Sequence, residues 1–217
     1  MLTPRDNDWN RFWQHAARPR SQISWSKQRI LRVIGPHLAP GKRIVEAGCG
    51  SGFFSAHFCD NGLLTTAVDF SQQALDLARI ATQGRAQILK ADFLKNPLPE
   101  LIKEKVDLIF TDGLFEHFSS SDQDNIMRNF LSILKQGGKV LTFVPNRYSP
   151  WQLIRPFFMP GINERPFVLR GLHNLNKRNA LHIETSGGLN VFPWRVSPEG
   201  KLAQYFGMIL FAVAVKT

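Results

Sequence analysis

Three glycines at alternate positions, Gly48, Gly50 and Gly52, follow the acidic residue Glu46. An apolar, β-branched pair precedes Glu46 and a helix-compatible segment follows the last glycine, so a strand, a tight loop and a helix are expected here. Glycine lets a ligand approach the backbone, because a Cβ would otherwise stand in its way. The N-terminus of the following helix would offer unpaired N–H groups to a carboxylate or phosphate. The loop is therefore the first candidate binding site.

Acidic residues also mark the ends of three later segments with strand-like patterns. Asp69 ends the second strand, about 20 residues beyond the loop, where a carboxylate binds ribose hydroxyls in nucleotide-binding folds. Asp92 follows the third strand and Asp112 ends the fourth. Asp69 could instead cap a helix and Asp92 could form a turn. The glycine loop upstream favours the interpretation of Asp69 as a ligand-binding residue, and for Asp92 both interpretations stay open from the residues alone.

A histidine after the fourth strand is the candidate general base. His117 follows Glu116, and an unperturbed imidazole titrates near neutrality. The competing interpretation is that His117 shapes a pocket without taking a proton, and that Glu116 holds a backbone group or a helix. Cys49 and Cys59 have neither the pattern of a disulfide framework nor metal-ligand spacing, so we expect reduced thiols and no metal site.

Alternating strand and helix patterns must position these side chains. At the N-terminus, a stripe of Trp9, Phe12 and Trp13 predicts one amphipathic helix within 1–20, and a second helical pattern covers 23–38. The alternation predicts an α/β fold with a mostly parallel sheet. The expected strands are 42–47, 63–69, 86–91, 106–112, 139–144, 189–195 and 208–215, and the later expected helices are 53–61, 71–82, 122–134 and 169–181.

The motifs resemble those of class I S-adenosylmethionine-dependent methyltransferases, in their small-molecule (type 11-like) branch. The resemblance rests on Glu46 with its three alternate glycines, on the Asp-to-Glu-His run within 106–117, and on the Leu-Lys-Gln-Gly-Gly junction at 134–138. It covers roughly 40–145 well and the last strands by pattern alone. It implies a Rossmann-like, seven-stranded, mostly parallel sheet with an antiparallel C-terminal strand and helices on both faces.

The resemblance further implies S-adenosyl-L-methionine as the cofactor and methyl transfer as the activity. Asp69 would bind the ribose, Asp92 with an apolar neighbour would hold the adenine, and Asp112 would lie beside the methionine part. The cofactor-binding residues implied in this way are Glu46, Gly48, Cys49, Gly50, Gly52, Asp69, Phe70, Asp92, Phe93, Thr111 and Asp112.

Length and charge indicate one domain with basic flanks. The 217 residues carry a net charge of +10, divided as +7 over 1–43, −3 over 44–144 and +6 over 145–217. Within this single domain the resemblance implies N-terminal lid helices (1–40), a cofactor-binding core (41–145), a substrate cap (146–182) and C-terminal strands (183–217). Arginine suits carboxylate or phosphate groups, so an anionic, partly apolar small molecule is the expected substrate. The candidate substrate residues are Trp13, Arg147, Tyr148, Arg155 and Arg170.

Three other functions stay open. The basic flanks also suit an RNA methyltransferase acting on oxygen or a ring nitrogen, and the apolar stretch 151–159 suits a peripheral membrane enzyme with a lipid-like substrate. A cofactor-binding protein without catalysis is the third. Methylation of exocyclic base amines is disfavoured because its Asn/Asp-Pro-Pro-aromatic signature is absent. The N-terminus lacks an apolar signal region and no apolar run approaches 18 residues, so we expect a cytoplasmic protein with no integral membrane segment.

Overall fold

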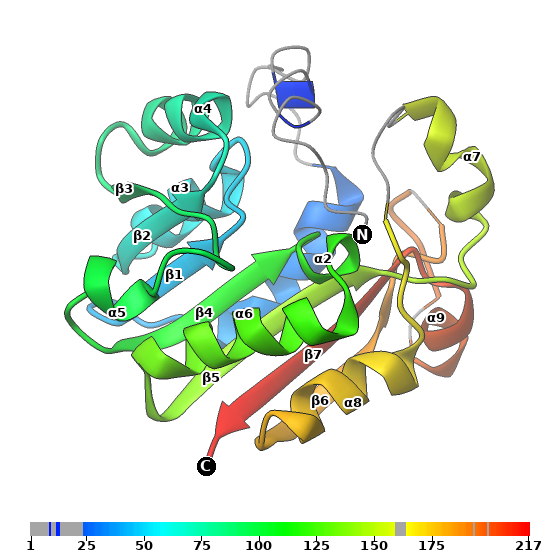
Figure 1. Ribbon diagram of the computed structural model, residues 1–217. Helices are drawn as coiled ribbons and strands as arrows, with labels where there is room; N and C mark the ends of the chain where they lie inside the picture. The colour runs from blue at the N-terminus through cyan, green and yellow to red at the C-terminus, as the bar shows by residue number, and fades with distance from the viewer. Residues whose placement is uncertain (1–8, 10–11, 14–23, 159–163, 193, 199) are drawn as a thin grey trace.

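Seven strands form one twisted sheet in the computed structural model, which describes residues 9, 12–13, 24–158, 164–192, 194–198 and 200–217 (Figure 1). The strand order is β3-β2-β1-β4-β5-β7-β6. The first five strands of the chain run parallel, and β7 is antiparallel to both β5 and β6. The predicted fold class is confirmed. The strands are β1 (Arg43–Ala47), β2 (Leu64–Asp69), β3 (Gln87–Lys90), β4 (Val106–Asp112), β5 (Leu134–Pro145), β6 (Leu181–Leu189) and β7 (Ile209–Lys216).

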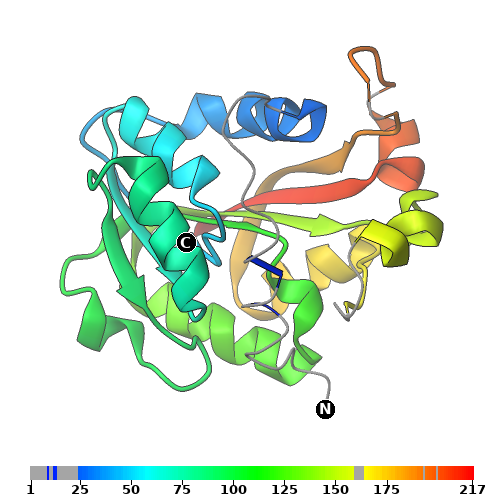
Figure 2. The ribbon, with the colours of Figure 1, turned by 90° about the horizontal axis from the view of Figure 1, so that it is seen from above.

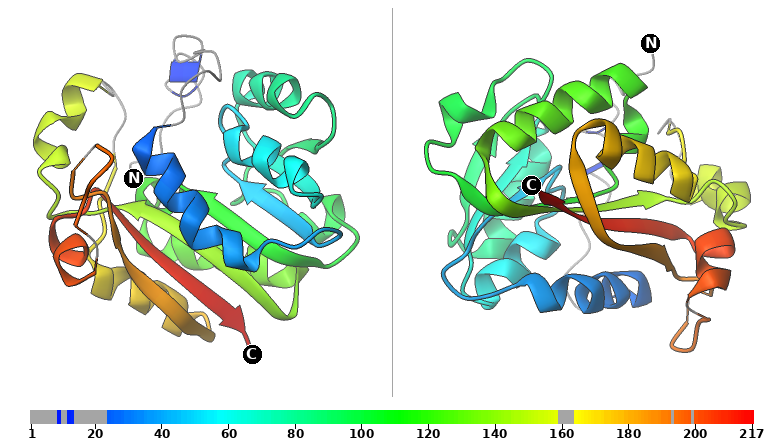
Figure 3. Two further views of the ribbon diagram at one scale, coloured as in Figure 1. Left: turned by 180° about the vertical axis from the view of Figure 1, so that it is seen from behind. Right: turned by 90° about the horizontal axis from the view of Figure 1, so that it is seen from below.

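Helices cover both faces of this sheet (Figure 2). The helices described are α2 (Trp25–Ile34), α3 (Phe53–Asp60), α4 (Gln72–Thr82), α5 (Leu98–Leu101), α6 (Ser120–Ile133), α7 (Trp151–Phe158), α8 (Leu169–Arg178) and α9 (Lys201–Phe206), with short 3-10 turns η1 (Gly35–His37) and η2 (Phe115–His117). Figure 3 shows α2 crossing the face opposite to α6 and α8.

The alternation of side chains along each strand explains why the sheet has a hydrophobic core on each of its two faces. In β1, Ile44 packs with residues of α2 and α3, whereas its neighbour Val45 packs with residues of α6 and α8. Leu108 and Ile109 in β4 divide in the same way. Successive side chains of a strand point to opposite faces, so an apolar run in a central strand supplies both cores at once.

The C-terminal part differs from the sequence-based expectation. The helix expected at 169–181 ends at Arg178, and β6 occupies Leu181–Leu189, earlier than the strand expected at 189–195. β6 pairs with β7 along one side, and such an edge position accepts polar residues and glycines that an apolar pattern does not predict. Gly188 is required there, because a Cβ would lie 1.8 Å from the carbonyl oxygen of Ala203 in α9.

The N-terminal helix expected within 1–20 lies largely outside the described residues, although Trp9, Phe12 and Trp13 are described. The second N-terminal helix is confirmed as α2, which begins at the N-cap Ser24. Among the described residues, none of the helices has the length and apolar character needed to cross a membrane.

Candidate functional site

A cavity of about 660 Å³ opens where the parallel strands end. The loops after β1, β2, β3 and β4 contribute to its wall, together with the N-terminal aromatic residues and the end of β5. It therefore lies around the β1/β4 boundary, where the strand order reverses. Ligands of open α/β sheets bind at such a switch point, outside the carboxyl ends of the strands.

The glycine loop forms one wall of the cavity. Gly48, Gly50 and Gly52 have φ values of 76°, 47° and 74°, a left-handed region that favours glycine. Gly48 and Gly50 line the cavity. The described cavity wall does not include Gly52, and a Cβ there would lie 2.5 Å from Cα of Ala78 in α4. Gly52 thus acts through the close packing of α3 against α4 and not through a surface that a ligand could contact.

An aromatic roof, which we define as Trp9, Phe12 and Trp13, covers this loop. The Trp9 and Trp13 rings are stacked, with 6.5 Å between centroids. A Cβ on Gly50 would lie 2.5 Å from the Trp13 ring, so the ring rests directly on the loop. Trp9 meets the His117 ring edge-on at 4.9 Å. The predicted substrate residue Trp13 therefore does line the cavity.

Asp69 lines the cavity from the end of β2, as expected. One carboxylate oxygen accepts a hydrogen bond from Gly50 N at 3.0 Å and the other from Ser71 N at 2.9 Å. Burial raises the pKa of Asp69, and these backbone donors act in the opposite direction. The carboxylate consequently fixes the glycine loop.

Asp92, Phe93 and Phe70 complete this end of the cavity. The Asp92 carboxylate accepts from Leu94 N at 3.0 Å and forms an ion pair with Lys95 at 3.0 Å. Phe93 is buried and packs edge-on against the ring of Phe130 in α6. The predicted adenine-binding pair is thus on the cavity wall, with Phe93 anchored in the core.

Three buried or partly buried titratable side chains, Glu46, Asp112 and Lys27, line the cavity. Glu46 and Asp112 both line it, and burial raises the pKa of Glu46 to about 8 and that of Asp112 to about 6. Glu46 also accepts a hydrogen bond from the Ser55 hydroxyl. Lys27 of α2 joins them: desolvation lowers its pKa, while Asp112 and Glu46 oppose that shift. Its ammonium group lies 4.1 Å from the centroid of the Phe53 ring.

Sequence reasoning missed Lys27, because it belongs to a helix that carries no recognisable motif.

Two predicted cofactor residues, Cys49 and Thr111, differ in whether they line the cavity. Cys49 lines the cavity, and burial raises the pKa of its thiol well above the usual value, so it stays protonated. Thr111 is fully buried and lies off the described cavity wall; its hydroxyl has no hydrogen-bond partner among the described residues.

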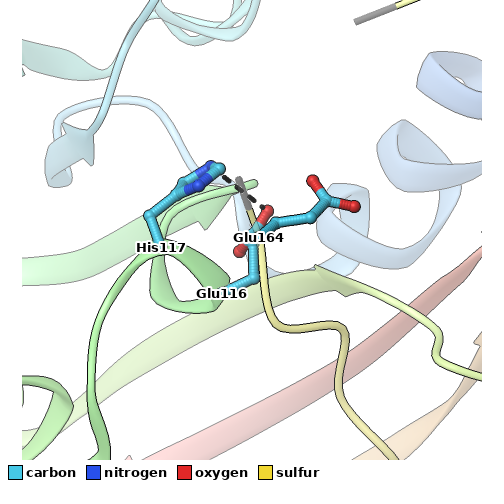
Figure 4. A group of neighbouring side chains, drawn as sticks. All are labelled: Glu116, His117 and Glu164. Atoms are coloured by element: carbon cyan, nitrogen blue, oxygen red, sulfur yellow. Dashed lines mark ion pairs between the residues drawn. The ribbon is translucent and has the colours of Figure 1, made fainter. Parts of the chain in front are cut away.

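His117 lines the cavity beside two carboxylates (Figure 4). Glu116 precedes it in η2, and Glu164 comes from the segment that follows α7. Burial raises the pKa of Glu116 well above its usual value, and Glu164 raises it further. Burial also raises the pKa of Glu164, which pairs with Arg155 at 3.0 Å. Glu164 carries no sequence motif and was not predicted.

The structure divides the candidate substrate residues into two groups. Trp13 and Arg155 line the cavity. Arg147, Tyr148 and Arg170 are exposed and lie off the described cavity wall. Arg147 and Tyr148 lie in the connection after β5 and Arg170 lies in α8, and basic charge alone does not tell which arginine side chains reach the cavity. The expectation of a shared arginine pocket is corrected accordingly: one arginine of the three reaches the cavity.

Comparison with known proteins supports the motif-based interpretation. Residues 45–142 match the family model described as a methyltransferase domain. The ubiquinone biosynthesis O-methyltransferase of Coxiella burnetii (strain RSA 493 / Nine Mile phase I) is 28% identical over 142 residues, which cover 64% of this chain and 58% of that relative. The chain therefore spans less than two thirds of this curated relative.

Solved structures resemble the whole fold. The N-methyltransferase NodS of Bradyrhizobium japonicum, in complex with S-adenosyl-L-homocysteine, has a TM-score of 0.68 at 15% identity, covering 97% of both chains. A TehB-like SAM-dependent methyltransferase of Corynebacterium glutamicum has a TM-score of 0.67 at 18% identity, covering 98% of both. The predicted resemblance to class I methyltransferases is confirmed.

Proposed function

We propose, from the methyltransferase domain at 45–142, that this chain transfers a methyl group from S-adenosyl-L-methionine to a small organic molecule. The observation that carries the proposal is the placement of Glu46, Asp69 and Asp112 around one cavity at the switch point of the sheet. The accepting atom is an oxygen, nitrogen, sulfur or carbon. Oxygen has the support of the relative named an O-methyltransferase, and nitrogen that of NodS.

The residues present fit this cofactor. Bound S-adenosyl-L-methionine supplies an electrophilic methyl group on a sulfonium, and it also carries an ammonium, a carboxylate and a ribose diol. Asp112 would stabilise the positive charges, protonated Glu46 would accept a hydrogen bond from the ammonium through its carbonyl oxygen, and Lys27 would pair with the carboxylate. Asp69 would accept from the diol, Asp92 with Phe93 would hold the adenine, and the glycine loop admits a close backbone approach.

The chain would promote the reaction chiefly by positioning and by excluding water. Methyl transfer is an in-line displacement, and orienting two reactants can lower a barrier by ~7–11 kcal/mol without a covalent enzyme intermediate. The cavity wall would hold the substrate nucleophile in line with the methyl group that the cofactor would supply, with the sulfur leaving group on the opposite side. His117 is the candidate acceptor of a substrate proton. The aromatic roof keeps the cavity apolar on the side facing solvent.

The substrate is proposed to be partly apolar and to carry an anionic or oxygen-rich group. Trp9, Phe12 and Trp13 offer an apolar surface, and Arg155 offers a planar guanidinium on the cavity wall. Exposure of Arg147 and Arg170 keeps the second candidate open, an RNA methyltransferase or a peripheral membrane enzyme that uses the basic flanks. We propose a cytoplasmic location, and no nucleic-acid partner for the favoured function.

Calorimetry with S-adenosyl-L-methionine tests the cofactor part of the proposal. Asp69→Ala is expected to weaken binding by about 1–3 kcal/mol, because a charge-assisted contact is lost and the loop loses its anchor at Gly50 N. The control is Asp76→Ala, which removes an exposed carboxylate of α4 that pairs with Arg79. Affinity unchanged in a folded Asp69→Ala variant would contradict the ribose assignment.

Transfer of a radioactive methyl group tests the activity. The protein is incubated with methyl-labelled cofactor and with phenols, carboxylic acids, amines and RNA in parallel reactions. Label in a small molecule would support the favoured function. Label in RNA, with binding that falls steeply as salt is added, would support the alternative, because phosphate contacts give a steep salt dependence.

A further inference from the structure

We propose that Glu116, His117 and Glu164 form a divalent-cation site on the wall of the cavity. Their donor atoms, one imidazole nitrogen and two carboxylate oxygens, all lie within 4.8 Å of one another. Figure 4 shows the three side chains gathered at the end of β4 and beside the segment that carries Glu164. This inference goes beyond methyl transfer, and it was not expected from the sequence, where no metal-ligand spacing was found.

The separations suit a metal ion. Neighbouring ligands about 2.0–2.2 Å from a cation lie roughly 2.8–3.6 Å from one another in octahedral or tetrahedral arrangements. Nε2 of His117 is 3.8 Å from Oε1 of Glu116. A small rotation of the side chains would therefore bring all three atoms to bonding distance.

An unsatisfied carboxylate oxygen points to a missing ligand. Glu116 is 2% exposed, and its Oε2 atom has no hydrogen-bond partner among the described residues. Burying a carboxylate oxygen without a partner costs free energy. Because Glu116, His117 and Glu164 all line the same cavity, a cation entering it would supply the missing partner.

The backbone holds the two halves of the cluster together. Arg165 N donates a hydrogen bond to the Glu116 carbonyl oxygen at 2.8 Å, next to Glu164 in the chain. Phe167 N donates to Pro145 O at 2.9 Å, which fixes the same segment to the end of β5. Arg155 lies 3.0 Å from Oε1 of Glu164 and would orient that carboxylate from behind, as outer-sphere groups commonly orient metal ligands.

The donor set indicates the class of ion. Carboxylates suit Mg²⁺, Ca²⁺ and Mn²⁺, whereas imidazole suits Zn²⁺, Fe²⁺ and other transition ions. One nitrogen with two oxygens favours a first-row transition cation such as Mn²⁺ or Zn²⁺. With Arg155 present and the imidazole neutral, two ionised carboxylates leave a net charge of −1 for the cation to compensate.

The cation would also face the substrate. Three protein ligands leave coordination positions open, and these would face the cavity because the cluster forms part of its wall. A substrate with neighbouring oxygen donors, such as a vicinal diol, a catechol or a hydroxy acid, could fill them. This extension to substrate class rests on the proposed function, whereas the cation site itself does not. With a cation bound, the ligating nitrogen of His117 would hold the ion and would not accept a substrate proton.

Manganese titration followed by electron paramagnetic resonance tests the site, since bound Mn²⁺ loses the sharp signal of the free ion. The wild-type chain, without cofactor or substrate, is expected to bind one Mn²⁺. Glu116→Gln and Glu164→Gln are each expected to weaken binding by at least about tenfold, the scale seen even for outer-sphere changes. Both replacements keep the shape of the side chain, and circular dichroism would verify that the variants fold.

A surface pair provides the matched control. His182 and Glu184 are both exposed on β6, and the double variant H182Q/E184Q is expected to bind Mn²⁺ like the wild type. No saturable binding by the wild type at about 1 mM Mn²⁺, where even weak sites fill, would overturn the proposal. Binding of Mn²⁺ by either cluster variant as tightly as by the wild type, or loss of binding in the surface control, would also overturn it. Cofactor affinity is measured separately without metal, so a failure of the methyltransferase proposal would be recognised independently.

Discussion

Glu46 makes the stability of the protein depend on pH in a direction unusual for a carboxylate. The side chain is 3% exposed at the end of β1, and burial raises its pKa from 4.5 to about 8. The Ser55 hydroxyl and Lys27 act against this shift but do not cancel it. We therefore expect the native protein to hold a proton on Glu46 at neutral pH, while the unfolded chain does not.

The size of the effect follows from this difference in pKa. Each pKa unit corresponds to 1.36 kcal/mol, so the interval from 4.5 to about 8 amounts to about 5 kcal/mol as an upper limit. The contribution of Glu46 is fully present below pH 4.5, falls as pH rises through this interval, and is lost above about pH 8. Stability falls with pH because the native state binds more protons than the unfolded state.

Urea denaturation of the wild type and Glu46→Gln, each at several values between pH 5 and pH 8, measures this contribution. Glutamine keeps the shape and still accepts from Ser55, but it does not titrate. The difference in free energy of unfolding, variant minus wild type, is expected to increase by about 1 kcal/mol for each unit by which the pH rises. The exposed Glu100→Gln serves as the control and should show a constant difference. A constant difference for Glu46→Gln would refute the reasoning.

Two further predictions concern packing and substrate binding. Gly52→Ala should lower the free energy of unfolding by about 2–4 kcal/mol, because the new Cβ clashes with α4 at a backbone φ of 74° that already disfavours alanine. Gly84→Ala is the control: it has a φ of 71° with open space around it, so it should show only the backbone cost of about 1 kcal/mol. Thermal denaturation compares the two, and equal losses would contradict the packing role. Arg155→Ala should raise KM for the true substrate several-fold and leave cofactor affinity unchanged. Arg170→Ala, at an exposed position, should leave both KM and cofactor affinity unchanged. Steady-state kinetics on the identified substrate measures this, and the same KM in both variants would contradict a substrate role for Arg155.

The sequence was most informative where local chemistry and position coincide. The order of strands and helices from β1 to β5, apart from the short helix α5, was predicted, because apolar runs, glycines and helix caps mark it directly. Asp69 and Asp112 were found for the same reason: each ends a parallel strand, and such ends meet at one edge of a sheet. Gly52 shows the limit of this logic, since its spacing in the motif is equally compatible with a ligand contact and with the helix packing that the structure reveals.

Residues brought in from distant segments could not be predicted. Lys27 and Glu164 reach the cavity through the placement of α2 and of the segment after α7, which depends on tertiary packing. The charge of an arginine does not show whether its side chain is buried or exposed. Arg155 lines the cavity, whereas Arg170 is exposed. β6 was misplaced because an edge strand with polar residues and Gly187 and Gly188 lacks an apolar run.

The position of β7 has a consequence for how the chain acquires its structure during synthesis. β7 is made after β5 and β6, yet it lies between them and pairs with both along its length. The segment up to β5 can begin to assemble while translation continues, since domains fold from the N-terminal side as they emerge. β6, however, has no strand to pair with until β7 leaves the ribosome, and until then β5 presents an open, apolar edge. Closure of the sheet is therefore a late event with non-local contacts, and the nascent chain should be most prone to aggregation just before it.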